Sequence, residues 1–292
     1  MTFNAFLQNL SNGISLGFLF ALIAIGYSMV YGVLNLINFA HGDIFMMATF
    51  FAYYAIAFFS LPWGIAFFLA IILTAVLGVL VDRFAYRPLR NSPRISCLCS
   101  AIGMSFLLEN FAIVVFGGRP KAFFRPEVFT KVFTISGVRV HSVSIVTPII
   151  AILALLVLSY IIYRTKVGLA MRAISRDFDT ANLMGININK TIAFTFAIGS
   201  GLAGIGAILW ALRYPQIYPY MGIFPGWRAF AAAIMGGIGS IRGATLGGFL
   251  VGVLTIMIVA FLPALAGYKD AFIFIGVIIV LLWKPKGLFG ED

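Results

Sequence analysis

Charged side chains are scarce in this sequence of 292 residues: 10% are Asp, Glu, Lys or Arg, whereas 62% are hydrophobic. The first 81 residues contain a single formally charged side chain, Asp43. A soluble domain of this size needs far more charge to cover its surface. The composition therefore excludes a soluble globular protein and indicates a chain embedded in a lipid bilayer.

The sequence is also poor in residues that carry catalysis or bind metal ions. Its two histidines, His41 and His141, are far apart, and its two cysteines, Cys97 and Cys99, stand in an apolar run without a nearby His or acidic residue. Neither a metal site nor a disulfide framework is predicted from this pattern. The sequence has no G-x-x-x-x-G-K-[ST] phosphate-binding loop, so we expect no cofactor in this chain and no ATP hydrolysis by it.

The net charge of +11 would suggest a nucleic-acid partner in a soluble protein. In a membrane protein, basic residues gather in the loops on the cytoplasmic side, so we expect a bilayer and no nucleic acid. The basic loops 83–94 and 164–190 are predicted to be cytoplasmic, together with Lys284 and Lys286 near the C-terminus. The loop 117–143 is also basic, but one helix separates it from 83–94, so it is predicted to be periplasmic.

Seven apolar stretches approach or exceed the roughly 20 residues that a helix needs to span a bilayer. They are residues 12–32, 62–82, 95–116, 144–163, 191–212, 242–262 and 270–284. Two more, 33–60 and 228–241, are apolar but interrupted by polar residues or glycines. We therefore predict a single all-α membrane domain over 1–292. It would have about eight full helices, two short or broken membrane segments, up to ten crossings and both termini in the cytoplasm.

Alternation around a Ser-Gly turn in residues 132–140 predicts a small β-hairpin in the periplasmic loop. On a larger scale, the order helix, broken segment, helix, helix occurs twice, in 12–82 and in 191–284. Paired interruptions in two similar halves are typical of the substrate path of a transporter.

Polar groups and glycines inside these segments are the candidates for a translocation pathway, because unpaired polar groups in hydrocarbon are costly and must face protein or a water-filled cavity. The candidates are Asn38, His41, Gly42, Asp43, Glu109, Gly236, Gly237 and Gly239. Other interpretations remain open at this point. The first four could form an interfacial turn, Glu109 could make a structural hydrogen bond, and the glycines could serve helix packing alone.

Residues 177–184 of the cytoplasmic loop are predicted to form a short helix. Acidic residues stand in its first turn, Phe178, Ala181 and Met184 fall on one face, and Gly185 is suited to a left-handed C-terminal cap. Such a helix is suited either to packing on the membrane surface or to docking a partner.

Three separated motifs in this order resemble the LivH-type permeases of branched-chain amino acid ABC transporters. They are Asn-Phe-Ala-His-Gly at 38–42, Arg-Ala-Ile-Ser-Arg-Asp-Phe-Asp-Thr-Ala-Asn-Leu-Met-Gly-Ile at 172–186, and Met-Gly-Gly-Ile-Gly-Ser-Ile-Arg-Gly-Ala-Thr-Leu-Gly-Gly at 235–248. The resemblance implies a type II ABC importer-like fold in the bacterial inner membrane. It also implies a related second permease subunit, two cytoplasmic ATPases that bind ATP and Mg, and a periplasmic protein that delivers leucine, isoleucine or valine.

ABC importers carry a cytoplasmic E-A-A-x-x-x-G element that contacts the ATPases. Residues 179–185 match it at the acid, the second alanine and the glycine, but Thr180 replaces the first alanine and the usual downstream I-x-L-P is absent. The resemblance thus implies an ATPase-coupling loop that contains Arg172, Asp177, Phe178, Asp179, Ala181 and Gly185.

Two other interpretations compete with an ATP-driven permease. In an ion-coupled secondary amino acid transporter, Glu109, His41 and Asp43 would be the coupling groups. A membrane-embedded enzyme or a channel is the other alternative, and the absence of a catalytic cluster argues against the enzyme. The helix-bearing loop 164–190 favours docking to a soluble partner and hence the ATP-driven permease.

The charge pattern predicts which loops a membrane-impermeant thiol reagent can reach. A cysteine at position 90 or 176 should be labelled only from the cytoplasm, and a cysteine at position 130 only from the periplasm. Labelling of intact cells and of inverted vesicles checks this, with the unmodified chain as the control for Cys97 and Cys99. Periplasmic labelling at position 90 would reverse the predicted orientation.

Overall fold

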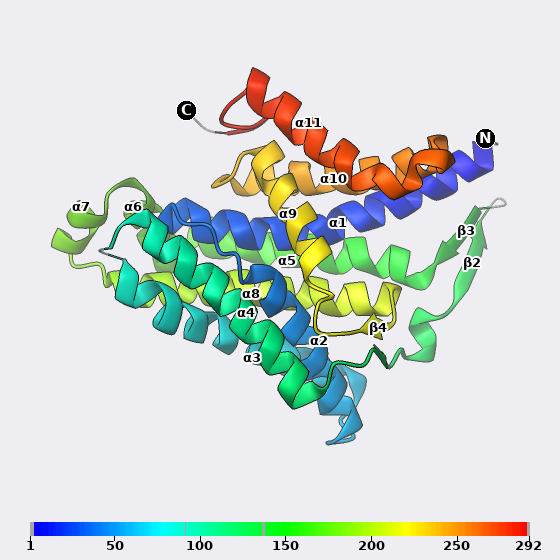
Figure 1. The fold of residues 1–292 in the computed structure, drawn as a ribbon, viewed down its shortest axis with the longest axis horizontal. Helices are drawn as coiled ribbons and strands as arrows, with labels where there is room; N and C mark the ends of the chain where they lie inside the picture. Colours follow the sequence, from blue (N-terminus) through cyan, green and yellow to red (C-terminus); the bar gives the residue numbers. More distant parts are fainter. Residues whose placement is uncertain (1–2, 91, 136–137, 291–292) are drawn as a thin grey trace.

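The computed structural model describes residues 3–90, 92–135 and 138–290 as a bundle of helices. Some of the longest helices lie along the longest axis of the bundle, whereas others cross it obliquely or steeply (Figure 1). The helices of the bundle are α1 (Phe3–Leu34), α2 (His41–Ala57), α3 (Trp63–Val81), α4 (Arg94–Phe116), α5 (Ser142–Arg164), α8 (Ile188–Arg213), α9 (Ile223–Gly236), α10 (Ile241–Phe261) and α11 (Lys269–Trp283). Two short helices at one end of the bundle are α6 (Lys166–Arg176) and α7 (Phe178–Leu183).

Single turns and short strands complete the described chain. The helical turns are η1 (Asp82–Tyr86), η2 (Arg87–Leu89), η3 (Glu127–Phe129) and η4 (Pro263–Tyr268), and the strands are β1 (Lys121–Ala122), β2 (Val132–Ile135), β3 (Val138–His141) and β4 (Gln216–Ile217). Strands β2 and β3 pair antiparallel, with Val132 opposite His141, which confirms the predicted hairpin. The Ser-Gly turn that was expected at 136–137 lies outside the described residues. Strands β1 and β4 also pair antiparallel and tie the loop after α4 to the segment after α8.

Within the described residues, seven helical segments are long and apolar enough to cross a membrane. Helices α2 and α9 are shorter, with 17 and 14 residues, and each follows a non-helical segment, 35–40 and 214–222 respectively. The predicted all-α membrane fold is therefore confirmed, with seven long spans rather than about eight. Both segments that were predicted to be interrupted contain a short helix.

The two ends of the described chain lie at opposite ends of the bundle. The start of α1 lies beside β3, whereas the segment after α11 lies toward the end that carries α6 (Figure 1). The chain passes through nine bundle helices between these two ends. The side of the membrane that each terminus faces stays a prediction.

The two halves of the bundle repeat the same order of elements in opposite directions. Helices α1 to α4 run as long, short, long, long, and so do α8, α9, α10 and the continuous segment of η4 and α11 (Pro263–Trp283). Helix α1 runs from the hairpin end toward the α6–α7 end, and α8 runs the other way (Figure 1). Most residues of α1 and α8 are buried, whereas most residues of α4, α5 and α11 are not. The centre of the fold is thus a pair of equivalent helices from an inverted repeat, an arrangement common among transporters.

Helices α1 and α10 touch backbone to backbone. A Cβ atom on Gly252 would collide with the Cα of Gly17, and one on Gly248 would collide with the Cα of Ala21. Lipid tails are as apolar as helix surfaces, so close van der Waals packing of small residues is a main force that joins membrane helices. These glycines hold α10 against the central helix.

Replacing Gly252 with valine should separate α1 from α10, because an added side chain has no space there. Overpacking of a tight contact typically costs about 1–3 kcal/mol, and a collision with backbone leaves little room for relief. We expect a lower melting temperature in detergent, measured by size-exclusion chromatography after heating. Gly103→Val on α4 is the matched control, because no atom lies within 4 Å of a Cβ at Gly103. Equal melting of both variants would show that this contact does not stabilise the bundle.

Candidate functional site

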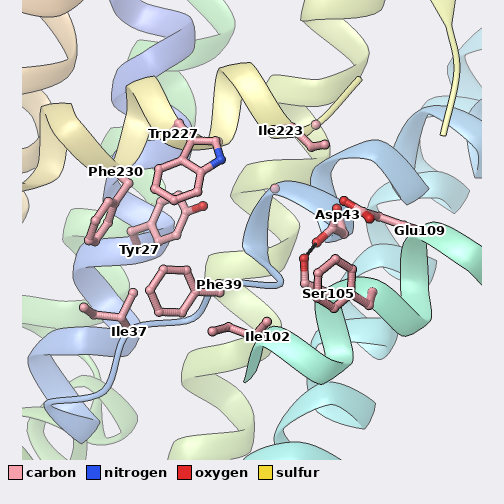
Figure 2. A pocket seen from close by; sticks show the side chains of 14 residues that line it. Tyr27, Ile37, Phe39, Asp43, Ile102, Ser105, Glu109, Ile223, Trp227 and Phe230 are labelled. Atoms are coloured by element: carbon pink, nitrogen blue, oxygen red, sulfur yellow. Dashed lines mark hydrogen bonds between the residues drawn. The ribbon is translucent and has the colours of Figure 1, made fainter. Parts of the chain in front are cut away.

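A cavity of about 280 Å³ lies where the first turns of α2 and α9 meet (Figure 2). Its lining comes from α1, α2, α4, α9 and the segment before α2, and consists of Tyr27, Ile37, Phe39, Gly42, Asp43, Ile102, Ser105, Phe106, Glu109, Gly222, Ile223, Gly226, Trp227 and Phe230. Phe106 of α4 and Trp227 of α9 are at least half exposed, so the cavity opens between these two helices. Its volume is near the lower end of the range for small-molecule sites, about 300–1,000 Å³.

The break before α2 gives the cavity its position. Helix α1 ends at Leu34, and Asn35 takes a left-handed backbone conformation with φ of +52°. The chain then turns back and begins α2 at His41, whose N–H donates to the carbonyl of Asn38. The Tyr86 hydroxyl is 3.2 Å from both the Ile37 carbonyl oxygen and the Asn38 Oδ1. This hydroxyl gives the break a polar partner inside the protein, as a break at membrane depth requires.

Three glycines let the starts of α2 and α9 touch. A Cβ on Gly222 would collide with the carbonyl oxygen of Gly42, and one on Gly226 would lie 3.2 Å from the Cα of Gly42. The N-terminus of a helix carries a partial positive charge from its free N–H groups. The contact thus brings two such ends to one wall of the cavity.

The polar part of the lining comes from α2 and α4. The Ser105 hydroxyl donates a 2.5 Å hydrogen bond to Asp43 Oδ2, and Glu109 lies one turn beyond Ser105 on α4 (Figure 2). Asp43 is 3% exposed and Glu109 is 7% exposed. The cavity thus holds two neighbouring carboxyl groups from different helices, one of which, Asp43, accepts a hydrogen bond from a hydroxyl.

Aromatic rings form the facing wall. The ring centroid of Phe230 is 5.7 Å from that of Tyr27 and 6.2 Å from that of Phe39. Trp227 lies about one turn before Phe230 on α9 and belongs to the same wall (Figure 2). Such a wall offers apolar contact to an aliphatic group. The cavity therefore has an acidic side and an apolar side.

The structure brings together only part of the predicted pathway set. Gly42, Asp43 and Glu109 line the cavity, whereas Asn38 and His41 lie behind it. The His41 ring is fully buried, 4.5 Å from the Tyr27 ring, and so tight against α1 that a Cβ on Gly26 would collide with it. His41 therefore supports the wall from behind.

The predicted glycines Gly236, Gly237 and Gly239 stand at the other end of α9, so the structure does not bring them to the same cavity. Gly237 and Gly239 have φ values of +114° and +96°, which favour glycine. Gly239 lines a separate cavity of about 750 Å³ beside Arg172 and Arg176 of α6. The sequence pattern located both breaks but could not tell which end of α9 meets α2.

Hydrogen bonds from distant segments hold this end of α9. The Gly239 N–H donates to Ser28 Oγ on α1 at 2.7 Å. The N–H groups of Leu288 and Phe289, after α11, donate to the carbonyls of Met235 and Gly236 at 2.9 Å each. The segment 285–290 thus caps α9, whose last carbonyls have no partner within the helix.

Several lining residues were missed by the sequence analysis. Ser105 could have been found, because it precedes Glu109 by four residues and so lies on the same face of a helix. Tyr27, Trp227 and Phe230 carry no comparable signal, since aromatic residues are common throughout this chain. Within the described residues, no cluster of three or more His, Cys, Asp or Glu side chains could hold a metal ion.

The predicted coupling loop forms a compact unit at one end of the bundle (Figure 1). Asp177 caps α7, because its Oδ1 accepts hydrogen bonds from the N–H groups of Asp179 and Thr180 at 2.9 and 3.2 Å. The Thr180 hydroxyl donates to the other oxygen, and these bonds lower the pKa of the Asp177 carboxyl. Gly185 has φ of +80°, which confirms the left-handed cap.

The faces of α7 differ from the predicted stripe in one respect. Ala181 is 3% exposed and Phe178 is partly buried, but Met184 is 78% exposed. Leu183 is 87% exposed beside it. The helix stops at Leu183 after six residues, so Met184 lies past its end and turns away from the buried side. The tip of the loop therefore presents two large apolar side chains.

On α6, the Arg172 guanidinium stacks 5.5 Å from the Tyr163 ring centroid.

Comparison with known proteins gives consistent matches over nearly the whole chain. The family model described as "Branched-chain amino acid transport system / permease component" matches residues 9–281. The high-affinity branched-chain amino acid transport system permease protein LivH of Salmonella typhimurium is 40% identical over 98% of this chain and 96% of its own length. LivH of Escherichia coli K12 is 39% identical and BraD of Pseudomonas aeruginosa 40% identical, with the same shares covered.

A solved structure, PsaBC from Streptococcus pneumoniae in complex with Fab, shares the fold. Its TM-score is 0.51 at 14% sequence identity, and the match covers 96% of this chain and 93% of that chain. At this identity the similarity concerns the arrangement of helices alone.

The cap of α7 should depend on the charge of Asp177. Its pKa is lowered in the folded chain, so the cap is present above the ordinary pKa of an aspartate and is lost as the pH falls through the lowered value. Asp177→Ala should speed hydrogen exchange at the amides of Asp179 and Thr180, and Asp177→Asn should largely preserve their protection. Asp179→Ala is the control, since no cap bond uses that side chain. Unchanged exchange in Asp177→Ala would contradict the capping role.

Proposed function

Because the chain belongs to the family of permease components of branched-chain amino acid transport systems, we propose that it forms the path by which leucine, isoleucine or valine crosses the inner membrane. It is a multi-pass permease subunit of an ABC transporter and not an enzyme. The observation that carries the proposal is the 40% identity over 98% of the chain to permeases of that named function. The same observation gives no support to an ion-coupled secondary transporter.

The partners that we propose are those of a complete importer: a related second permease, two ATPases that bind ATP and Mg, and a periplasmic binding protein. Family membership implies a complex with partner subunits. The exposed apolar tip at Leu183 and Met184 supports docking of the ATPases there, because large apolar side chains that project from a polar loop mark interaction surfaces. We propose that residues 1–292 form one permease domain.

Basic residues orient the bundle in our proposal. Arg87, Arg90, Arg172 and Arg176 all lie at the end that carries α6 and α7. Loops rich in Arg and Lys stay in the cytoplasm, so we place this end inside. The start of α1 and the β2–β3 hairpin are then periplasmic, and the segment after α11 is cytoplasmic.

Two cavities that follow each other along the bundle support a path through the chain. Tyr27 and Phe230 line the central cavity, and Tyr31 and Ile234 line the larger cavity toward α6. These pairs are one helical turn apart on α1 and α9, so the cavities follow each other along the same two helices. We propose that a substrate passes from the first to the second when α9 moves relative to α1.

Transport by a reconstituted complex tests the proposal. Proteoliposomes that contain this chain, its second permease and the ATPases should take up leucine when supplied with ATP and the binding protein. The chain alone should show no ATPase activity, because it has no phosphate-binding loop. It should also show no uptake driven by a pH gradient, because permeases of this family work with partner ATPases. Proton-driven uptake by the chain alone would restore the ion-coupled alternative.

Substitutions at the loop tip test the docking surface. Leu183→Glu combined with Met184→Glu should abolish co-purification of the ATPases, while the permease still inserts, because both side chains already face solvent. Val128→Glu is the matched control: Val128 is also an exposed apolar residue but belongs to the periplasmic loop. Gly185→Val should act in the same direction as the double variant, because valine strains a left-handed backbone by about 1–2 kcal/mol. Normal ATPase binding by the double variant would place the contact elsewhere.

A further inference from the structure

The central cavity is unbalanced in charge. Its lining contains two carboxyl groups, Asp43 and Glu109, and no Lys, Arg or His. Ser105 donates to Asp43, but no group in the described part of the chain donates a hydrogen bond to Glu109. Glu109 is nevertheless 93% buried, and Figure 2 shows its carboxyl group beside that of Asp43 at the cavity wall.

Nearby cations are engaged elsewhere. Arg228, next to Trp227 on α9, makes a two-pronged ion pair with Asp270 at the start of α11, with distances of 2.6 and 2.9 Å. Arg90 pairs with Asp82. A buried carboxylate without a partner is costly in a membrane protein, so the acidic wall calls for a cation from outside the chain.

The adjacent helix end offers the opposite charge. Helix α9 has no acidic side chain in its first turn and no side-chain cap, so no side chain compensates the partial positive charge at its N-terminus. The Ile223 N–H already donates to the Tyr220 carbonyl at 3.3 Å, and Pro225 has no N–H. Helix α2, by contrast, carries Asp43 in its own first turn. Ile223, the first residue of α9, lies on the same side of the cavity as Asp43 and Glu109 (Figure 2). A negative and a positive region thus lie next to each other.

We infer that this cavity is itself a recognition site for the zwitterionic head of an aliphatic α-amino acid. Glu109 and Asp43 hold the ammonium group, and the first turn of α9 holds the carboxylate. The two charges of an α-amino acid are attached to one carbon, which suits regions that lie side by side. The aliphatic side chain packs on the rings of Tyr27, Phe39 and Phe230. The inference rests on the proposed function and extends it, because the permease then takes part in selection instead of only conducting what it is given.

Direct binding to the assembled transporter, without the binding protein, tests the assignment. Tritiated leucine is measured at equilibrium on the purified complex, with 3-methylbutylamine and 4-methylpentanoate as competitors that carry only the ammonium or only the carboxylate. Wild type should bind leucine and respond to both competitors. Glu109→Gln should weaken leucine and the amine roughly tenfold, the size expected for one charge-assisted hydrogen bond, and leave the affinity for the carboxylate competitor unchanged.

Two further variants make the result specific. Asp43→Asn should act like Glu109→Gln, and Glu127→Gln, in the exposed turn η3, should leave all three affinities unchanged. Size-exclusion profiles confirm that each complex is assembled. Leucine binding that requires Na⁺ and does not respond to the amine would assign the acidic wall to a metal cation and overturn the inference.

The remaining outcomes separate the inference from the proposed function. Equal leucine affinity in wild type and Glu109→Gln, or no leucine binding at millimolar concentration, would overturn the recognition site. If the same wild-type complex in liposomes still takes up leucine from the binding protein with ATP, the proposed function stands. Failure of that uptake would instead refute the proposed function itself.

Discussion

Where the backbone of this chain is not helical inside the bilayer, its N–H and C=O groups must find hydrogen-bond partners within the protein. The rest of the structure depends on this constraint. A continuous helix satisfies the requirement by itself, but α2 and α9 begin and end where neighbouring chain is not helical. The Tyr86 hydroxyl supplies a hydrogen-bond partner to the break before α2. Ser28 and the segment 285–290 supply hydrogen-bond partners to the far end of α9. The breaks are tolerated only because distant elements provide hydrogen-bond partners for their backbone groups. The cavity between the breaks therefore depends on the packing of the whole bundle.

Rigid central packing keeps these distant partners in place. Helix α1 carries Ser28, touches α10 through glycine and supplies Tyr27 to the cavity. One buried helix thus contacts the turn after α9, the cavity wall and the helix α10, so a displacement of α9, the shortest bundle helix, would change both the cavity and the α6 end of α9. The proposed coupling of an ATPase at α7 to the cavity would need an element that can take two positions, and α9 is suited to that role.

Much of this architecture could be predicted from composition and periodicity. Long apolar runs predicted the seven spans, and the Asn-Phe-Ala-His-Gly stretch predicted the first break. The position of Gly185 after the short helix predicted its left-handed conformation. The meeting of Gly42 with Gly222 could not be predicted, because contacts between residues so far apart in sequence depend on how the two halves pack. The same is true of the close approach of the Glu109 and Asp43 carboxyl groups in the cavity. It is also true of Gly237, whose backbone marks a break at the end of α9 away from the central cavity.

The capping of α9 by residues 285–290 also sets an order of events during synthesis. Met235 and Gly236 leave the ribosome about fifty residues before Leu288 and Phe289, which later receive their carbonyl oxygens. During that interval the end of α9 has no partner, and lipid cannot supply one. Until α11 has been inserted, these two carbonyl groups must therefore bond to water or to the insertion machinery. Final closure of the bundle is thus a late, post-insertion step, and a chain interrupted within α11 would leave an exposed backbone end that quality-control proteases can recognise.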